Sequence, residues 1–248
     1  MTMAVGFLCI KGVVIAADRQ MTGSSYTFQE CKLGSFKWLN GRAIWGYSGN
    51  YDTAKVVGQQ LESRFGLNAT IQPSDIQENL KQALLSSIPK KESFQNLFGV
   101  VAEGQIKLFV CSGSMVTDAG RCEIIGWGDS ALGRYLRGLF LKGLMLPTTM
   151  QAAVAGIYLI LQGKNYDGQY VGGGTDVLTL SLDGTMGVID RAKSGEWEKE
   201  LETIEGWTVQ TFNFLTEPRI TPEWISRRFE EFNSKAESFC SKVRGATG

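Results

Sequence analysis

The feature that most constrains the fold is a pair of apolar segments close to the start of the chain. They read MAVGFLCI at residues 3–10 and VVIAADR at residues 13–19, with Lys11-Gly12 between them. Runs rich in β-branched and aliphatic residues, joined by so short a link, predict a β-hairpin. Neither run alternates apolar with polar residues, so we expect both faces of the hairpin to be covered by other elements.

The remaining sequence groups strands with pairs of helices. Apolar and β-branched runs predict strands at residues 25–33, 35–39, 42–48, 96–104, 105–113, 121–128, 177–184 and 185–192. Helical spacing of apolar residues predicts helices at residues 52–65, 74–88, 130–141 and 148–162, and a late helix from Thr221. This order differs from the one-for-one alternation of a doubly wound parallel sheet. It predicts two packed sheets with helix layers outside them.

Two of these helices carry the sequence signature of a capping box. Ser74 is followed by Gln77, and Thr148 is followed by Gln151, each at the third position. In such a box the hydroxyl of the first residue accepts a hydrogen bond from a backbone N–H of the first turn. The glutamine side chain accepts one from the backbone N–H of the capping residue. In the helix before these two, the apolar side expected to face the core consists of Val56, Val57, Leu61 and Phe65.

The chain has 248 residues and a mass of 27.2 kDa, which is enough for one large domain. No Pro- or Ser-rich linker divides it. We therefore predict one domain over residues 2–190 and a C-terminal elaboration over 191–248 that packs on the same domain. The late helix carries a narrow apolar seam, which must pack on its own domain or on a neighbouring subunit. The seam consists of Ile225, Phe229, Phe232, Ala236, Phe239 and Val243.

Composition excludes several kinds of function. The chain has no histidine, so it lacks a Ser-His-Asp triad, a Cys-His dyad and every metal site that needs an imidazole. Its 25 Lys and Arg residues balance 25 Asp and Glu residues, so we expect no nucleic-acid partner and no attraction to an anionic membrane. The phosphate-binding patterns GxxxxGK[ST] and GxGxxG after a strand are absent. We expect neither a cofactor nor a metal.

Cysteine usage and apolar runs predict a cytoplasmic protein. The five cysteines, at positions 9, 31, 111, 122 and 240, include no CxxC pair, which indicates free thiols in a reducing compartment. The first apolar run lacks a basic region before it and stops at Lys11. The most apolar stretch, residues 150–161, is shorter than the roughly 20 residues that span a bilayer. We therefore expect no membrane partner.

The second residue offers chemistry that needs no histidine. It is a threonine, small enough that the initiator methionine is commonly removed, which would leave Thr2 with a free α-amine beside its hydroxyl. An α-amine has a pKa of about 7.7 to 8.0, so a good fraction is neutral at cellular pH and accepts a proton. One residue could then serve as both nucleophile and base.

Four segments resemble the N-terminal-nucleophile hydrolases of the proteasome β-subunit type. They are TMAVG at 2–6, KGVVIAADR at 11–19, Lys32-Leu33 and GYSGNYD at 46–52. The second is the most specific, because it is an apolar strand ending in Ala-Ala-Asp-Arg at a set distance from an N-terminal threonine. The resemblance covers about residues 2–190. It implies an α+β fold, a four-layer αββα sandwich in which two packed antiparallel sheets lie between helix layers.

The resemblance also implies roles for particular residues. Thr2 would attack the scissile carbonyl through its hydroxyl after Met1 is removed. Asp18 would hold Lys32, whose ammonium lowers the pKa of the hydroxyl and keeps the α-amine neutral. The backbone N–H of Gly49 would donate to the oxyanion, and Ser48 is the alternative because the spacing to the next aspartate is one residue shorter than in the family.

Two further segments correspond to the family less closely. Gly126-Trp127-Gly128 has a tryptophan where the family has a serine that orients the threonine amine, and Asp129 or Ser130 would then take its part. Residues 167–173 resemble the family's Asp-x-x-Ser-Gly-Gly segment, with Val171 in the serine position. Asp167 is accordingly expected to support the site.

The resemblance implies a threonine-type endopeptidase that acts through an acyl-ester on Thr2. Its substrate would be a peptide or an unfolded protein, and its assembly a homo-oligomeric ring. Two alternatives stay open. The same acyl-enzyme could pass its acyl group to an amine, as in a transpeptidase or protein ligase. The chain could instead be a non-catalytic, ring-forming subunit, an alternative that Trp127 suggests.

Overall fold

The computed structural model describes residues 2–22, 27–89, 93–126, 138, 146–215 and 221–245. The chain divides into two compact units, residues 1–194 and residues 195–248. The first unit contains the sheets and the helices that cover them. The packing of residues 191–248 on the first domain stays a prediction.

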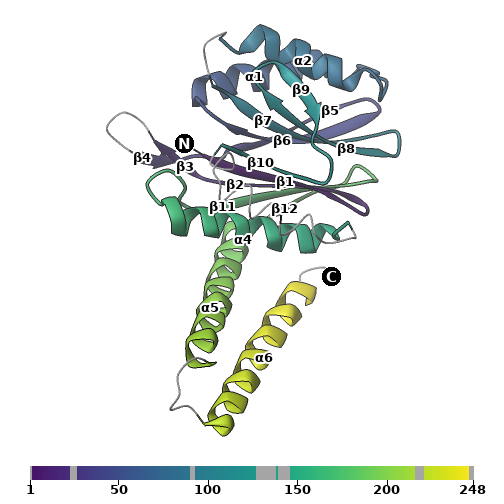
Figure 1. Cartoon of the computed structure of the whole chain (residues 1–248). Helices are drawn as coiled ribbons and strands as arrows, with labels where there is room; N and C mark the ends of the chain where they lie inside the picture. Colours follow the sequence, from purple (N-terminus) through teal and green to yellow (C-terminus); the bar gives the residue numbers. More distant parts are fainter. Residues whose placement is uncertain are drawn as a thin grey trace. The chain divides into compact units, whose positions relative to one another are not determined.

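The first sheet contains the hairpin that opens the sequence. It is antiparallel, with the strand order β10-β1-β2-β11-β12 (Figure 1). Its strands are β1 (Met3–Cys9), β2 (Gly12–Asp18), β10 (Cys122–Gly126), β11 (Thr175–Ser181) and β12 (Met186–Ile189). All of β2 and nearly all of β1 are buried, as the absence of alternation predicted.

The second sheet is also antiparallel, with the order β5-β6-β7-β8-β9. Its strands are β5 (Leu33–Trp38), β6 (Gly41–Ser48), β7 (Gln95–Ala102), β8 (Gln105–Ser112) and β9 (Met115–Asp118). A separate ribbon pairs β3 (Gln20–Thr22) with β4 (Thr27–Gln29). The single strand predicted at 25–33 is therefore wrong. The chain leaves the ribbon after β4, and Lys32 enters the core just before β5 begins.

The two sheets pack face to face, and helices cover their outer faces (Figure 1). Helices α1 (Tyr51–Arg64) and α2 (Ile76–Ser87) lie on the second sheet, and α4 (Thr149–Asp167) lies on the first. This is the four-layer αββα arrangement that the sequence predicted. The helix predicted at 130–141 lies outside the described residues. Apolar side chains fill the space between the sheets, among them Ala4, Val13, Ile15, Ile44, Leu97 and Leu108.

Helix starts follow local hydrogen-bond chemistry, and one of the two predicted capping boxes is confirmed. The Thr148 hydroxyl accepts from the Gln151 N–H, and the Gln151 side chain accepts from the Thr148 N–H. The box predicted at Ser74 is wrong, because Gln77 instead donates to the Val116 carbonyl on β9 at 2.8 Å. The glutamine thereby satisfies a backbone group of the sheet, so α2 begins at Ile76 without a side-chain cap.

The first helix is capped by an asparagine side chain. The Asn50 side chain accepts from the backbone N–H groups of Asp52 and Thr53, so α1 begins directly after β6. Val57 and Leu61 are fully buried on its inner side. The prediction for Val56 is wrong, because its side chain is 42% exposed.

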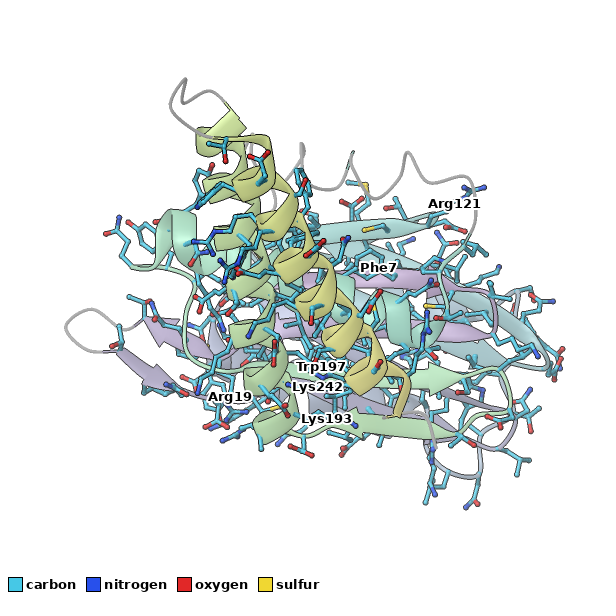
Figure 2. The ribbon with its side chains drawn as sticks, turned by 90° about the horizontal axis from the view of Figure 1, so that it is seen from below. Phe7, Arg19, Arg121, Lys193, Trp197 and Lys242 are labelled. Atoms are coloured by element: carbon cyan, nitrogen blue, oxygen red, sulfur yellow. The ribbon has the colours of Figure 1, made fainter. Side chains whose placement is uncertain are left out.

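The second unit consists mainly of two helices, α5 (Arg191–Leu215), which begins in the first unit, and α6 (Pro222–Gly245). The late helix was predicted, whereas α5 was not. Lys242, labelled in Figure 2, lies on α6. It forms ion pairs with Glu196 and Glu200 on α5. Among the described residues, no helix combines the length and the apolar character that crossing a bilayer requires.

Candidate active site

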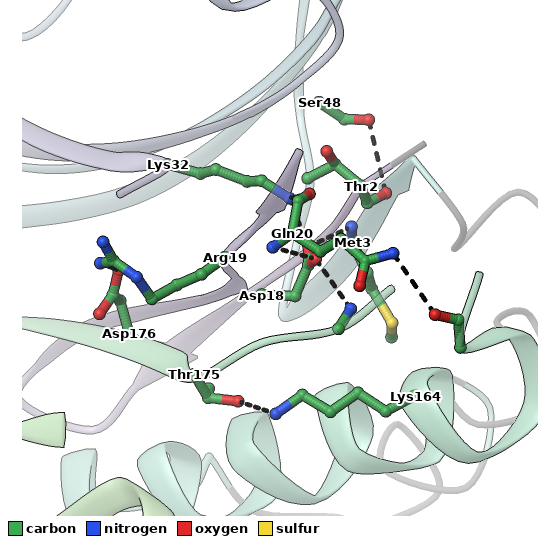
Figure 3. A network of polar contacts seen from close by, with 12 residues as sticks. Thr2, Met3, Asp18, Arg19, Gln20, Lys32, Ser48, Lys164, Thr175 and Asp176 are labelled. Carbon is green, nitrogen blue, oxygen red and sulfur yellow. Dashed lines mark hydrogen bonds and ion pairs between the residues drawn. The ribbon is translucent and has the colours of Figure 1, made fainter. Parts of the chain in front are cut away.

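The centre of the candidate site is a buried ion pair between Asp18 and Lys32 (Figure 3). Asp18 is the last residue of β2, and Lys32 directly precedes β5. The Lys32 Nζ lies 2.9 Å from Asp18 Oδ1, and both side chains are 0% exposed. Lys32 also donates to the carbonyl of Gln20. Taking two charges out of water is costly unless they are paired and hydrogen-bonded, and this pair meets both conditions.

Four donors saturate the Asp18 carboxylate. Its Oδ1 accepts from Lys32 and from the Met3 N–H at 2.9 Å. Its Oδ2 accepts from the backbone N–H groups of Gln20, at 3.1 Å, and Gly172, at 3.2 Å. A carboxylate has about four lone-pair sites, so these four donors fix its orientation.

Burial sets the electrostatics of Lys32. Removal from water disfavours the ammonium and lowers the pKa of Lys32 below its ordinary value, while the nearby Asp18 carboxylate opposes that shift. With little solvent to screen it, the charge of this lysine acts more strongly on its neighbours than a surface charge does.

Thr2 lies beside this pair (Figure 3). Thr2 is 3% exposed and directly precedes β1. The peptide group between Thr2 and Met3 is held at both ends. Its N–H donates to Asp18, and its carbonyl accepts from the Ser48 hydroxyl at 3.5 Å. The structure thus brings three of the residues singled out from the sequence, Thr2, Asp18 and Lys32, into one cluster.

The turn from β6 to α1 adjoins Thr2 through Ser48. Gly49 follows with φ of +137°, and a Cβ on it would lie 2.6 Å from a ring carbon of Phe94. A residue with a side chain would be strained there. Both alternatives for the oxyanion donor, Ser48 and Gly49, therefore belong to a turn next to Thr2.

The segment that contains Asp167 reaches the ion pair through its backbone. Asp167 ends α4, and its carbonyl accepts from the Tyr170 and Val171 N–H groups. The Gly172 N–H donates to Asp18, and the Gly172 carbonyl accepts from the N–H groups of Arg19 and Gln20. The role expected of the Asp167 side chain stays a prediction.

Several residues of the cluster were not found from the sequence. Gln20 and Gly172 bind the ion pair through backbone groups, and every residue type has these groups, so the sequence does not indicate such contacts. The Gln95 side chain accepts a hydrogen bond from the Gly126 N–H at 2.7 Å. Its position near Thr2 follows from its strand register opposite Ser48, which the sequence does not give. Trp127, Asp129 and Ser130, on which the sequence expectations for the neighbouring loop depended, lie outside the described residues.

Cysteine thiols and potential metal ligands are further titratable groups of the chain. Within the described ranges, no cluster of three His, Cys, Asp or Glu residues is arranged to hold a metal. All five cysteines are free, and three of them are buried. Burial raises the pKa of the Cys9 thiol to about 12 and raises that of Cys111 as well, so both stay protonated near neutral pH.

Solved structures of Anbu proteins share this architecture. The Anbu (Gly-1) mutant from Hyphomicrobium sp. strain MC1 is 17% identical with a TM-score of 0.70, covering 88% of this chain and 100% of that one. Anbu, the ancestral beta-subunit, from Yersinia bercovieri is 17% identical with a TM-score of 0.67, covering 88% and 98%. The Anbu complex from Pseudomonas aeruginosa, described as a helical assembly, is 15% identical with a TM-score of 0.63, covering 90% and 99%.

The fold is that of the proteasome β-subunit type. No protein-family model matches the chain, and neither does any curated protein. At such low identity, the similarity to Anbu establishes the fold and leaves the roles of individual residues open. The roles of Thr2, Asp18, Lys32, Gly49 and Asp167 stay predictions.

Proposed function

We propose that this Anbu-like chain is a threonine-type endopeptidase whose nucleophile is Thr2, exposed by removal of Met1. The observation that carries the proposal is the buried Asp18–Lys32 pair, because its carboxylate also binds the peptide group that follows Thr2. In the absence of histidine, a threonine α-amine beside a buried cation supplies a base at neutral pH. The substrate is a peptide or an unfolded protein.

In the proposed reaction, the Thr2 α-amine takes the hydroxyl proton as the oxygen attacks the scissile carbonyl. Lys32 stabilises the developing negative charge and opposes protonation of the amine by like-charge repulsion. The tetrahedral oxyanion accepts from a backbone N–H of the turn at Gly49, a contact worth on the order of 10²- to 10³-fold in rate. Collapse expels the leaving amine, which receives the proton. Water then cleaves the acyl-ester and regenerates Thr2.

The decisive experiment is mass spectrometry of the intact protein before and after treatment with a β-lactone or epoxyketone probe. The expected result is a chain that begins at Thr2 and gains one probe molecule there. Thr2→Ala should abolish labelling, while Thr2→Ser should keep it, because serine retains both the hydroxyl and the α-amine. Active protein that retains Met1 would refute the proposal.

The same preparation separates the alternatives. If an acceptor peptide turns the product from a hydrolysed into a joined peptide, the acyl-enzyme serves a transpeptidase. If the processed chain with a free Thr2 never takes up the probe, the chain is a non-catalytic subunit.

We also propose that the chain assembles with copies of itself as a ring. The support for self-assembly is the similarity to the Pseudomonas aeruginosa Anbu complex, which is described as a helical assembly. Closure of the assembly into a ring is what the resemblance to proteasome β-subunits implies. Light scattering coupled to size-exclusion chromatography should give a mass several times that of the 27.2 kDa chain. A monomeric mass at micromolar concentration would refute self-assembly without affecting the proposed chemistry.

A further inference from the structure

Ser48 and Gln95 reach from the second sheet to the first at the point where β1 begins. They are partners in register across β6 and β7. The Ser48 hydroxyl donates to the Thr2 carbonyl at 3.5 Å, and Gln95 Oε1 accepts from the Gly126 N–H at 2.7 Å. On the first sheet, the residue after Thr2 is the register partner of Gly126. Two neighbouring polar side chains of one sheet therefore bind two neighbouring backbone positions of the other.

Gly126 leaves the space that this arrangement needs. A Cβ at that position would lie 1.9 Å from the Thr2 carbonyl oxygen and 2.5 Å from Ser48 Oγ. Its φ of +73° is also in the left-handed region, where glycine is favoured. Any side chain at position 126 would displace either the hydroxyl or the peptide group of Thr2.

The contacts on Thr2 come from opposite directions. Asp18, on the first sheet, accepts from the N–H of the Thr2–Met3 peptide, and Ser48, on the second sheet, donates to its carbonyl. A peptide group held at both ends has a fixed plane. Because that plane includes the Thr2 Cα, it limits the directions in which the amine and the hydroxyl can point. Displacement of a reacting group by about 1 Å costs on the order of 10²-fold in rate.

We infer that Ser48 and Gln95 are positioning residues that together form a cross-sheet latch, fixing Thr2 for attack on its substrate. Ser48 holds the peptide group after the nucleophile. Gln95 holds the backbone of Gly126 so that the space for the Ser48 hydroxyl is kept. The inference rests on the proposed function, because the latch acts on the reaction only through Thr2.

The test compares Ser48→Ala, Gln95→Leu and Gln95→Glu with the wild-type protein and with Gln105→Leu as a control. Gln105 is an exposed glutamine at the start of β8. It pairs with Ala102, at the end of β7 that lies away from Gln95. Ser48→Ala and Gln95→Leu should each lower kcat for a peptide substrate about 10-fold or more, with little change in KM. Gln95→Glu keeps the acceptor for Gly126 and should recover most of the rate. In a variant that combines Ser48→Ala with Gln95→Leu, the loss of kcat should be smaller than the product of the two single losses, because the residues act as one unit.

Hydrogen exchange at the Gly126 amide, followed by NMR, tests the latch without any activity. Gln95→Leu should accelerate this exchange at least about 10-fold, and Gln95→Glu should not. Unchanged exchange in Gln95→Leu overturns the latch. Faster exchange combined with unchanged kcat in both single variants overturns its positioning role. If the wild type never takes up the probe, the proposed function fails, and with it the positioning role, while exchange still decides whether the latch exists.

Discussion

Two of the lysine–carboxylate contacts among the described residues have the same chemistry in opposite surroundings. Lys32 meets Asp18 between the sheets, where both side chains are 0% exposed. Lys242 meets Glu196 and Glu200 on the surface of the helical unit, where the lysine is 42% exposed. Burial lowers the pKa of Lys32, whereas the hydrogen bond with Glu200 raises the pKa of Lys242. Desolvation is the largest cause of the shift at Lys32, and the hydrogen bond with Glu200 is the largest cause at Lys242, so the two shifts have opposite directions.

The difference shows which pair can do chemistry. A surface pair is screened by salt and water and contributes little to the stability of the fold. A buried pair costs free energy to desolvate, but its charge acts at nearly full strength on the groups it touches. Asp18 of the buried pair accepts a hydrogen bond from the N–H of the Thr2–Met3 peptide group. The charges of this pair therefore lie directly beside the candidate nucleophile.

The largest effect is expected from removing the buried cation. Lys32→Met leaves the Asp18 carboxylate buried without its partner, so the free energy of unfolding should fall by about 3 to 5 kcal/mol. Labelling of Thr2 should become undetectable. Urea denaturation and probe uptake measure the two effects. Replacing both partners, as Lys32→Met with Asp18→Leu, should restore neither the stability nor the labelling, because the backbone N–H groups of Met3, Gln20 and Gly172 lose their acceptor. A double variant that still takes up the probe would contradict the role of the pair.

Gly126→Ala should have the next largest effect. The methyl group collides with the Thr2 carbonyl, so we expect at least about a 10-fold loss of labelling rate. Gly120→Ala is the matched control, because Gly120 also has positive φ, at +66°, but has no atom within 4 Å of the added Cβ. Both variants carry the left-handed backbone cost of about 1 to 2 kcal/mol. Equal labelling in the two variants would show that the space around Thr2 is not critical.

The pH dependence of labelling should sharpen the contrast between the pairs. On the acid side, the rate should rise as the Thr2 α-amine loses its proton, at or below about pH 8. On the alkaline side, the rate should fall as Lys32 loses its charge. Because burial lowers the pKa of Lys32, this fall should begin at a lower pH than for an ordinary lysine. Rates measured from pH 5 to 11 provide the check, and a profile that keeps rising up to pH 11 would contradict it.

The smallest effect is expected at the surface pair. Lys242→Ala removes two exposed ion pairs, and neither the urea midpoint at physiological salt nor the labelling rate should change measurably. The same measurements as for Lys32→Met provide the comparison. A loss comparable to that of Lys32→Met would show that exposure does not separate the two pairs.

Much of the fold could be predicted because its signals are local. Two neighbouring apolar runs predict the hairpin at the start of the chain. The capping box at Thr148 depends on two residues that are only three positions apart. Ser74 carries the same local signal, yet a carbonyl on β9 competes for Gln77, and sequence spacing contains no information about that strand. Helix α5 was missed because Gly195 and Gly206 and many charged residues obscure its periodicity.

The candidate site divides in the same way. Thr2, Asp18 and Lys32 could be singled out because each lies in a recognisable segment of the sequence. The place of Gln95 depends on strand register, so reading along the chain could not find it. Gly172 lies in the predicted segment 167–173, but its backbone contact with Asp18 has no sequence signal.

The first strand directly follows the candidate nucleophile and contributes a share of the central core. Met3, Ala4 and Val5 are fully buried directly after Thr2. A substitution there that loosens packing also displaces the reacting residue, so foldability and reactivity cannot be adjusted separately along this strand. Changes in substrate preference are therefore easier to reach through the surrounding loops than through this strand.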